Sequence, residues 1–380
     1  MRNTSTPCAM LNKNSRAKGK GDVFIPILAV ALALFGVLMV YSASSYSAMN
    51  DYGDAFFFVK KQIIGVVIGI SVMTFTCFFD YGRYKKIGIF AVALAVILLV
   101  LVFIPGIGVE SYGAKRWIGF FGVTVQPSEI AKFSLVLFAA GYFSAKPERA
   151  NRFLTVLPVI GVGVLLCVLI ILEPNMSITM CVGILLIGLL YAAGVKWRSI
   201  ALLLVPIIAA VPLLIIVEPY RLKRLSAFIN PWASPKGEGY QLLQSLYALG
   251  SGGWFGVGLF NSRQKFEFLP FSESDFILSV IGEEFGIFGV TVLFVVMFFL
   301  IYKGIKVASM ANDLFGMMLA SGIVMIYAVQ VLINALVVSG SIPPTGLPLP
   351  LISSGNTSVI VFLAAFGVLY NISRKATQIN

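Results

Sequence analysis

Histidine is absent from this chain of 380 residues. Its absence excludes histidine-ligated metal sites and removes the side chain that most often acts as a general base near neutral pH. The chain has four cysteines, and neither metal-ligand spacing nor a disulfide framework is visible at Cys8, Cys77, Cys167 and Cys181. We therefore predict no metal site from the protein side chains, and we expect acid–base chemistry to depend on carboxylates.

Charged residues are also scarce. They make up 12% of the chain, against about 25% in soluble domains, while 59% of the residues are hydrophobic. This composition predicts a membrane protein that crosses the bilayer several times. The net charge of +12 could suggest nucleic-acid binding, but most of the excess lies in short segments between apolar runs, as the positive-inside rule requires. We expect membrane lipid, and no nucleic acid, as a partner.

Ten segments contain the roughly 20 apolar residues that a helix needs to cross a bilayer core. They are residues 23–45, 57–79, 86–105, 128–145, 153–172, 176–194, 198–217, 275–302, 313–339 and 357–373. The predicted fold class is therefore all-α, a polytopic membrane domain of about ten helices over residues 23–373. A basic tail, residues 1–22, precedes it, and a short tail, residues 374–380, follows it. No small-residue cleavage site follows the first apolar run, so this run is predicted to be an uncleaved anchor.

The distribution of basic residues predicts the orientation. With the N-terminus in the cytoplasm, every even-numbered connection carries Lys or Arg, as at Lys85, Arg149 and Lys303. Both termini are then cytoplasmic. The largest loop, residues 218–274 between spans seven and eight, is then extracytoplasmic.

Two more extracytoplasmic loops, residues 106–127 and 341–358, are longer than a turn requires. The second is rich in Pro, Gly and Ser, and we predict that it forms a cavity wall, because irregular backbone at membrane depth must be buried or line a polar cavity. After the first, Glu129 and Lys132 lie three residues apart on one helix face. They are either a neutralising ion pair or part of the site.

The largest loop contains a helical pattern at residues 240–249 that is too short to span the bilayer. We predict that this helix lies in the membrane interface or re-enters the bilayer. Gln241, Gln244 and Ser245 share one of its faces. The glycines between residues 250 and 258 are expected to allow close backbone turns.

Four carboxylates lie where this loop meets span eight: Glu273, Asp275, Glu283 and Glu284. A charge at the centre of a membrane helix costs about 2.5–3.5 kcal/mol on insertion scales, so such acids usually face a partner or a cavity. Glu284 points nearly opposite Asp275, and Glu283 lies about 12 Å deeper, where pairing with a cation or the backbone is the simpler role. Asp275, taken alone, is either a helix N-cap or a general base.

Basic residues gather on the same extracytoplasmic side, where positive charge is normally scarce. They are Lys115, Arg116, Lys132, Arg221, Lys223, Arg224, Arg263 and Lys265. This set suits an anionic substrate at the outer leaflet. One carboxylate beside it is what glycosyl or phosphoryl transfer to a hydroxyl needs.

These segments resemble the SEDS family (shape, elongation, division and sporulation) of peptidoglycan glycosyltransferases, over nearly the whole chain. The resemblance rests on Arg116-Trp117-Ile118, Gln126-Pro127-Ser128-Glu129 with Lys132, Glu173-Pro174, Tyr220-Arg221-Leu222-Lys223-Arg224, Asn230-Pro231-Trp232, Gly239-Tyr240-Gln241, Ser262-Arg263-Gln264-Lys265-Phe266, Asp275-Phe276-Ile277 and residues 345–350. The FtsW-like and SpoVE-like division and sporulation branch fits better than the RodA-like branch.

The resemblance implies polymerisation of lipid II, a disaccharide-pentapeptide on undecaprenyl pyrophosphate, at the outer face of a bacterial cytoplasmic membrane. It implies that Asp275 is the general base. The residues expected to bind substrate are Arg116, Gln126, Glu129, Lys132, Arg221, Arg224, Gln241, Gln244, Ser245, Arg263, Lys265 and Glu283. The implied partners are a class B penicillin-binding transpeptidase and other divisome or sporulation proteins. A need for a divalent cation, Mg²⁺ or Mn²⁺, stays open.

Three stretches depart from the family pattern: Asn175-Met176-Ser177-Ile178, Ser353-Ser354-Gly355-Asn356-Thr357-Ser358, and Phe271 where the family has an acid. Two alternatives to the enzyme remain. The first is a lipid II flippase or another transporter, suggested by Glu129, Lys132 and Glu283 in or beside the spans. The second is a non-catalytic scaffold of the division complex, suggested by the departures.

Overall fold

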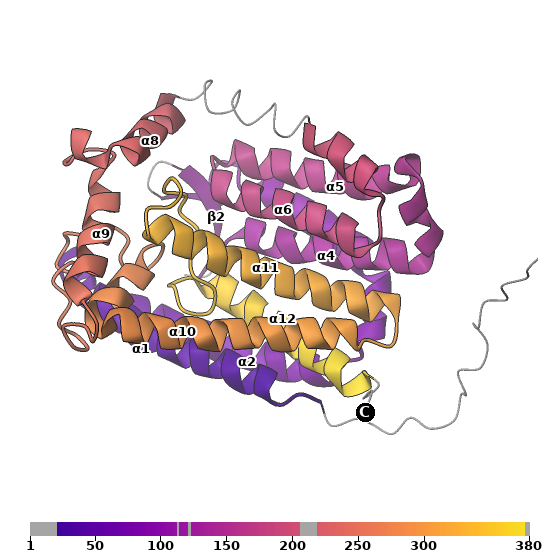
Figure 1. Cartoon of the computed structure of the whole chain (residues 1–380), viewed down its shortest axis with the longest axis horizontal. Helices are drawn as coiled ribbons and strands as arrows, with labels where there is room; N and C mark the ends of the chain where they lie inside the picture. Colours follow the sequence, from indigo (N-terminus) through magenta and orange to yellow (C-terminus); the bar gives the residue numbers. More distant parts are fainter. Residues whose placement is uncertain (1–20, 112–113, 121–122, 206–218, 377–380) are drawn as a thin grey trace, which may run out of the picture.

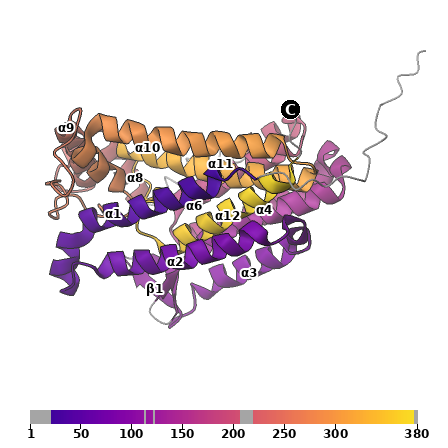
Figure 2. The same cartoon turned by 90° about the horizontal axis from the view of Figure 1, so that it is seen from below.

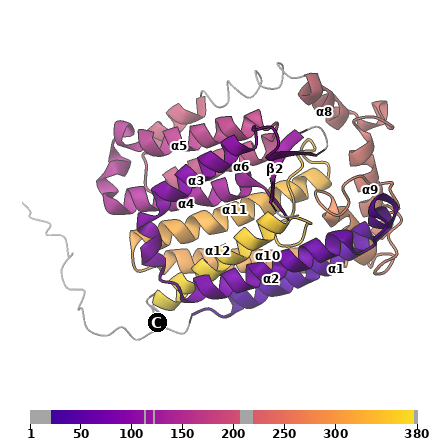
Figure 3. The same ribbon diagram turned by 180° about the vertical axis from the view of Figure 1, so that it is seen from behind.

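The structure is a computed structural model, and it describes residues 21–111, 114–120, 123–205 and 219–376. Its long helices run side by side along the longest axis of the molecule (Figure 1). The helices α8 (Pro219–Ile229) and α9 (Tyr240–Gly252) lie at one end of this bundle, and the C-terminal end of α12 (Asn356–Lys375) lies at the other. The views from below and from behind show the same two-ended arrangement (Figures 2 and 3).

The bundle helices follow the predicted spans. They are α1 (Phe24–Tyr52), α2 (Phe57–Phe78), α3 (Gly88–Leu101), α4 (Pro127–Ala145), α5 (Phe153–Leu172), α6 (Met176–Ala192), α10 (Ile277–Ser309), α11 (Leu314–Val338) and α12 (Asn356–Lys375). The seventh predicted span, residues 198–217, is helical over residues 197–205, and its remainder lies outside the described residues. Six of the helices (α1, α2, α5, α10, α11 and α12) are long and apolar enough to cross a membrane, and α3 and α6 are shorter apolar helices. The chain is a helical, multi-pass membrane protein.

The expectation of an all-α chain is incomplete at residues 106–127. A three-stranded antiparallel sheet occupies part of this loop: β1 (Gly108–Ser111), β2 (Ala114–Phe120) and β3 (Val123–Val125), in the order β1-β2-β3. Val109 pairs with Trp117, and Ile118 pairs with Val125. The strands are only three to seven residues long, too short for their alternation to stand out beside the apolar spans. The sheet gives Arg116 a rigid backbone.

Small residues allow the helices to approach closely, as is usual inside membranes. α12 packs along α2, and a Cβ added at Gly65 would lie 3.2 Å from Asn356 Cα. On α1, a Cβ added at Gly36 would lie 2.6 Å from the Leu351 carbonyl oxygen and 2.7 Å from Ile352 Cα. The loop between α11 and α12 is therefore packed directly against α1, deep in the bundle.

One end of the bundle carries the basic residues that the orientation argument places in the cytoplasm. A 3₁₀ helix, Tyr81–Lys86, contains three of them, and the preceding Asp80 forms an ion pair with Lys375 at the end of α12. The Tyr81 hydroxyl donates to Asp313, whose carboxylate also caps α11 through the Gly316 N–H. The opposite end holds the long loop, in which a 3₁₀ turn, Pro231–Ala233, joins α8 and α9. α9 covers the helix predicted at residues 240–249.

We expect Gly36→Ala to lower the midpoint of thermal unfolding in detergent, because the methyl group would meet the backbone of the 351–352 loop. Overpacking of this kind costs about 1–3 kcal/mol. Gly161→Ala on α5 is the matched control, since nothing lies within 4 Å of a Cβ there. Equal unfolding midpoints for the two variants, followed by tryptophan fluorescence, would show that the loop does not pack tightly on α1.

Candidate functional site

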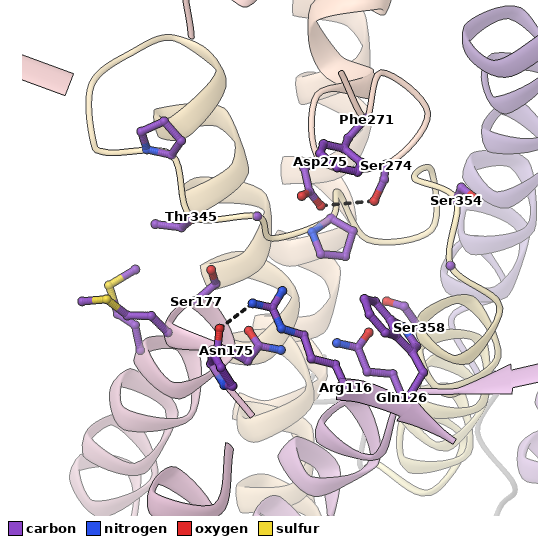
Figure 4. Close-up of a pocket in the computed structure, with 18 of the residues that line it drawn as sticks. Arg116, Gln126, Asn175, Ser177, Phe271, Ser274, Asp275, Thr345, Ser354 and Ser358 are labelled. Carbon is purple, nitrogen blue, oxygen red and sulfur yellow. Dashed lines mark hydrogen bonds between the residues drawn. The ribbon is translucent and has the colours of Figure 1, made fainter. Parts of the chain in front are cut away.

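A cavity of about 870 Å³ opens between the sheet, the α5–α6 turn, α8, α9 and the two loops that flank α10 and α12. Its volume lies in the range typical of ligand sites. Figure 4 shows Asp275 and Ser274 above it, Arg116 and Gln126 below, and Thr345 to one side. The cavity therefore joins segments that lie far apart in the sequence.

The wall of this cavity is divided by polarity. Apolar side chains from α5, α6 and α8 form one part: Ile171, Leu172, Met176, Met180 and Leu225. Polar and charged groups form another part, including Arg116, Gln126, Arg224, Gln241 and Asp275, and the rings of Phe58, Trp117 and Phe271 also line the cavity. A ligand that is anionic at one end and apolar at the other matches this division.

Asp275 lies in the turn before α10, where its backbone is held from two sides. Its carbonyl oxygen accepts from Asn334 Nδ2 at 2.9 Å, and the same amide donates to the Leu347 carbonyl at 2.8 Å. The preceding residue, Ser274, accepts from Ser353 Oγ at 2.6 Å. α11 and the 341–355 loop thus fix the position of this turn.

The Asp275 side chain is half-buried and points into the cavity. Its Oδ1 accepts from Ser274 Oγ at 3.2 Å, and no hydrogen bond to the first turn of α10 is found among the described residues. The residue at the N-cap position is Phe276. The N-cap alternative for Asp275 is therefore wrong, and its carboxylate is available to a ligand.

Burial raises the pKa of Asp275 above its ordinary value, while Ser274, Arg116 and Arg224 lower that pKa by smaller amounts. Burial also raises the pKa of Glu273, which lines the cavity two residues earlier. A buried carboxylate with a raised pKa is a stronger base than one in water.

The two arginines of the cavity wall are braced by backbone carbonyls. Arg116 donates from Nε to the Glu173 carbonyl at 3.2 Å and from Nη2 to the Pro174 carbonyl. Arg224 donates to the Pro344 carbonyl at 3.3 Å. Both guanidinium groups also act electrostatically on Asp275, so the positive charges are held near the base.

Five residues from the sequence-based site line this cavity, in agreement with their expected proximity: Arg116, Gln126, Arg224, Gln241 and Asp275. Gln241 Nε2 donates to the Pro270 carbonyl at 3.2 Å, which ties α9 to the turn before Asp275. The backbone N–H of Gln126 donates to Thr357 Oγ1 at 3.0 Å. Arg221 lies in α8, and its side chain is outside the described residues.

The structure does not bring the other expected residues to the cavity. Glu129 and Lys132 form a fully buried ion pair of 2.8 Å on α4, and Lys132 Nζ also donates to Gln330 at 2.7 Å. Of the two alternatives for Glu129 and Lys132, the structure therefore favours the neutralising ion pair. Gln244 is half-buried on α9 outside the cavity, and Arg263 is exposed outside it.

Ser245, Lys265 and Glu283 have structural contacts in place of the expected substrate contacts. Ser245 Oγ bonds to Ser279 Oγ and to the Val338 carbonyl, both at 2.8 Å. Lys265 is 5% exposed and pairs with Glu284 at 3.4 Å. Glu283 is 1% exposed and accepts from the loop before Asp275, which agrees with backbone pairing inside the bundle.

Sequence reasoning missed several residues that build the site. Asn334 is a buried amide in the mostly apolar helix α11, one turn after the buried Gln330, and buried polar side chains often mark functional positions in membrane helices. Asn175, at a departure from the family pattern, lines the cavity and caps α6 by accepting from the Ile178 N–H at 3.3 Å. No group of three His, Cys, Asp or Glu side chains that could hold a metal ion occurs within the described ranges.

The comparisons with known proteins agree over nearly the whole chain. The family model described as "Cell cycle protein", which groups FtsW, RodA and SpoVE, matches residues 22–378. A probable peptidoglycan glycosyltransferase FtsW of Geobacter metallireducens is 40% identical over 355 residues, which cover 93% of this chain and 95% of the relative. Stage V sporulation protein E of Bacillus subtilis is 37% identical over 359 residues, with coverages of 94% and 98%.

Solved structures share the fold. A chain from a peptidoglycan synthase complex, studied for its coordination of polymerization and crosslinking, matches with a TM-score of 0.77 and 25% identity, over 94% of this chain and 99% of that chain. The rod shape determining protein RodA of Thermus thermophilus matches with a TM-score of 0.67 and 23% identity, over 94% and 98%. The second likeness concerns the fold alone.

Glu173 generates a prediction about stability. Its side chain is 1% exposed, neither carboxylate oxygen has a hydrogen-bond partner among the described residues, and burial raises its pKa to about 8 although Arg116 lowers it. Between the ordinary value of 4.5 and about 8, the native state binds more protons than the unfolded chain. Stability should therefore fall as the pH rises through this window, by on the order of 1 kcal/mol per pH unit.

We expect the unfolding midpoint in detergent to drop between pH 5 and pH 8, and to drop less in Glu173→Gln, which cannot ionise. Glu148 is exposed, so Glu148→Gln is the matched control, and its unfolding midpoint should change with pH as the wild-type midpoint does. The same slope in all three proteins would contradict a raised pKa at Glu173.

Proposed function

Because the chain belongs to the family of FtsW, RodA and SpoVE cell-cycle proteins, we propose that it is a peptidoglycan glycosyltransferase that polymerises lipid II. The observation that carries this proposal is the half-buried Asp275 carboxylate, which faces a cavity whose wall also holds Arg116 and Arg224. This arrangement supplies a base for a hydroxyl and positive charge for a phosphate-bearing substrate.

The proposed reaction uses Asp275 as the general base. Its carboxylate takes the proton from the 4-hydroxyl of the acceptor GlcNAc, and the oxygen forms a bond to the anomeric carbon of MurNAc in the growing chain. The bond between that carbon and the pyrophosphate oxygen breaks, and the electron pair leaves with undecaprenyl pyrophosphate. The raised pKa of Asp275 suits this role, because a base is most effective when its pKa approaches the working pH.

The leaving group determines what else the site must do. Pyrophosphate departs as an anion, so positive charge can stabilise it and a second carboxylate acting as an acid is less needed. Arg116 and Arg224 are the cations of the described cavity wall, and their contacts with backbone carbonyls hold them in place before the substrate arrives. The apolar wall around Met176, Met180 and Leu225 is suited to the first units of the lipid.

Mg²⁺ or Mn²⁺, if bound, would be held by the substrate pyrophosphate together with at most Asp275 and Glu273, the acidic residues of the described cavity wall. Such sharing between one or two carboxylates and phosphate oxygens is usual for Mg²⁺. The cation would supply additional charge for the leaving group. The proposed proton transfer to Asp275 does not require it.

The proposal places the chain in the cytoplasmic membrane of a bacterium, with the cavity facing outward. We propose a class B penicillin-binding transpeptidase as its partner, together with other divisome or sporulation proteins. The support for a crosslinking partner is the likeness to a chain from a peptidoglycan synthase complex. Relatives named for both FtsW and stage V sporulation match the chain, so the proposal covers division and sporulation.

A transporter or scaffold is less well supported. A transporter needs polar groups along a path between the two membrane faces, whereas Arg116, Arg224 and Asp275 meet around one outward cavity. A scaffold needs no braced carboxylate facing that cavity. Translocation of labelled lipid II in liposomes by the Asp275→Asn variant would support the transporter. Normal complementation by the Asp275→Ala variant would support the scaffold.

We expect Asp275→Asn to lower the rate of lipid II polymerisation by the purified protein about 10²–10⁴-fold, the usual contribution of a general base. The measurement is glycan-strand yield over time, with and without the transpeptidase partner. Asp54→Asn is the control, since Asp54 lies in the α1–α2 connection and pairs with the exposed Lys60. Full polymer yield from Asp275→Asn would show that another group takes the proton.

The pH dependence gives a further expectation. Asp275 must be ionised to act as a base, so the rate should fall as the pH drops through its pKa. Because burial raises this pKa, the acidic limb should lie above the value of about 3.9 found for Asp in water. A limb at or below the ordinary value, measured at saturating substrate, would contradict the buried base.

A further inference from the structure

α10 is interrupted nine residues after its start. Gly286 has φ of +66° and ψ of −170°, which is not helical. In a continuous helix the Ile287 and Phe288 N–H groups would donate to the Glu283 and Glu284 carbonyls. Two helical hydrogen bonds are therefore missing inside a membrane helix, where unpaired backbone groups are costly.

Residues 252–258, which we name the strap, satisfy all four of these groups. The Glu283 and Glu284 carbonyls accept from Val257 N–H at 2.9 Å and Gly258 N–H at 3.0 Å. The Ile287 and Phe288 N–H groups donate to the carbonyls of Gly253 at 2.9 Å and Trp254 at 3.1 Å. Four bonds to the strap replace two within the helix, so the interruption is a built feature of the fold.

The interruption needs glycine on both sides. The backbone of Gly286 is in a region that is essentially restricted to glycine. A Cβ there would lie 2.5 Å from Gly256 N and 2.6 Å from Phe255 N. Gly256 itself has φ of +79° and packs against the Glu284 carbonyl. Any side chain at these two positions would force the strap and α10 apart.

The interruption separates two parts of α10 with different surroundings. Residues 277–284, the buried half-helix, are all buried, whereas Ile287 and Phe288 beyond the break are 54% and 63% exposed. Ser279 in the half-helix bonds to Ser245 of α9, which bonds in turn to the Val338 carbonyl of α11. The half-helix is thus bonded to α9 and, through Ser245, linked to the end of α11.

Two carboxylates of the half-helix hold the loop that leads to Asp275. Glu283 accepts from the Arg263 N–H at 3.0 Å, the Gln264 N–H at 3.3 Å and the Ser262 hydroxyl. Glu284 accepts from the hydroxyl of Ser42 on α1, and Lys265 pairs with it at 3.4 Å. Residues 262–265 are therefore fixed to the half-helix and to α1.

We propose that the half-helix, detached at Gly286 and held by the strap, sets the position of Asp275 independently of the spanning part of α10. Glu283 and Gly286 are positioning residues, since neither lines the cavity. Asp275 lies two residues before the half-helix, so a shift of the half-helix moves the base directly. The catalytic consequence of this inference rests on the proposed function. Its geometric part rests on the hydrogen bonds between the strap and α10.

The first experiment compares Gly286→Ala with Gly250→Ala in the purified full chain. Alanine at position 286 favours a continuous helix, which would reorient the half-helix and displace Asp275. We expect the turnover rate to fall at least tenfold with KM for lipid II changed less than twofold. Gly250 on α9 has open space around its Cβ, so its variant should keep wild-type turnover. Wild-type turnover in Gly286→Ala, or a change in KM alone, would overturn the proposal.

The second experiment uses Glu283→Gln, which keeps the side-chain shape but removes one of the two accepting oxygens. A displaced, better hydrated Asp275 should move the acidic limb of the pH–rate profile toward the ordinary Asp value, whereas simple loss of folded protein would lower the rate without moving the limb. An unmoved limb would argue against a positioning role for Glu283.

Amide hydrogen exchange tests the geometry without reference to activity. Residues 277–284 should exchange faster in Gly286→Ala than in Gly250→Ala. If the wild type fails to polymerise lipid II and this difference in exchange is found, the proposed function is wrong, but the proposal that the strap holds the half-helix is supported. If polymerisation occurs and exchange is equal in the two variants, the strap proposal alone is wrong.

Discussion

The end of the bundle that carries α8 and α9 depends on one constraint, that backbone polar groups away from water must find partners within the chain. Between α11 and α12, and again at Gly286, the chain leaves regular secondary structure while packed inside the bundle. Side chains and neighbouring backbone supply the missing bonds: Asn334 holds the turns at Asp275 and Leu347, Gln62 on α2 holds the Ser353 carbonyl at 3.2 Å, and the strap holds the break in α10. These bonds hold the irregular backbone that forms part of the cavity wall.

The same bracing sets the electrostatics of the site. A carboxylate in a partly dry environment becomes more basic, while adjacent guanidinium groups oppose that change. Burial dominates at Asp275, and Arg116 and Arg224 exert smaller opposing effects on its pKa. Both arginines are also tied to backbone carbonyls, so their charge is held in place by the fold. Base and cations therefore share one cavity.

The spans were largely predictable from the sequence because hydropathy reports on membrane helices directly. The site was only partly predictable. Arg116 and Arg224 stood out because positive charge is scarce on the predicted extracytoplasmic side, and Asp275 stood out as the base through the family resemblance. Charge alone does not tell whether a residue meets substrate or another residue. Lys265 and Glu283 were expected to bind substrate on that ground. Lys265 instead pairs with Glu284, and Glu283 accepts from the backbone N–H groups of Arg263 and Gln264. The role of Asn334 and the sheet that contains Arg116 could be recognised only in the structure. A single amide and strands of a few residues leave weak patterns in a sequence.

The buried pair on α4 has a consequence for how this sequence can change over generations. Glu129 and Lys132 are both inaccessible to solvent and neutralise each other, with Gln330 of α11 as the further partner of Lys132. Loss of either charge alone would leave its partner unpaired in the interior, at a cost of about 3–5 kcal/mol. Descendants of this chain can therefore abandon the pair only through a severely weakened intermediate or by two simultaneous replacements. We therefore expect the residues at positions 129 and 132 to change together.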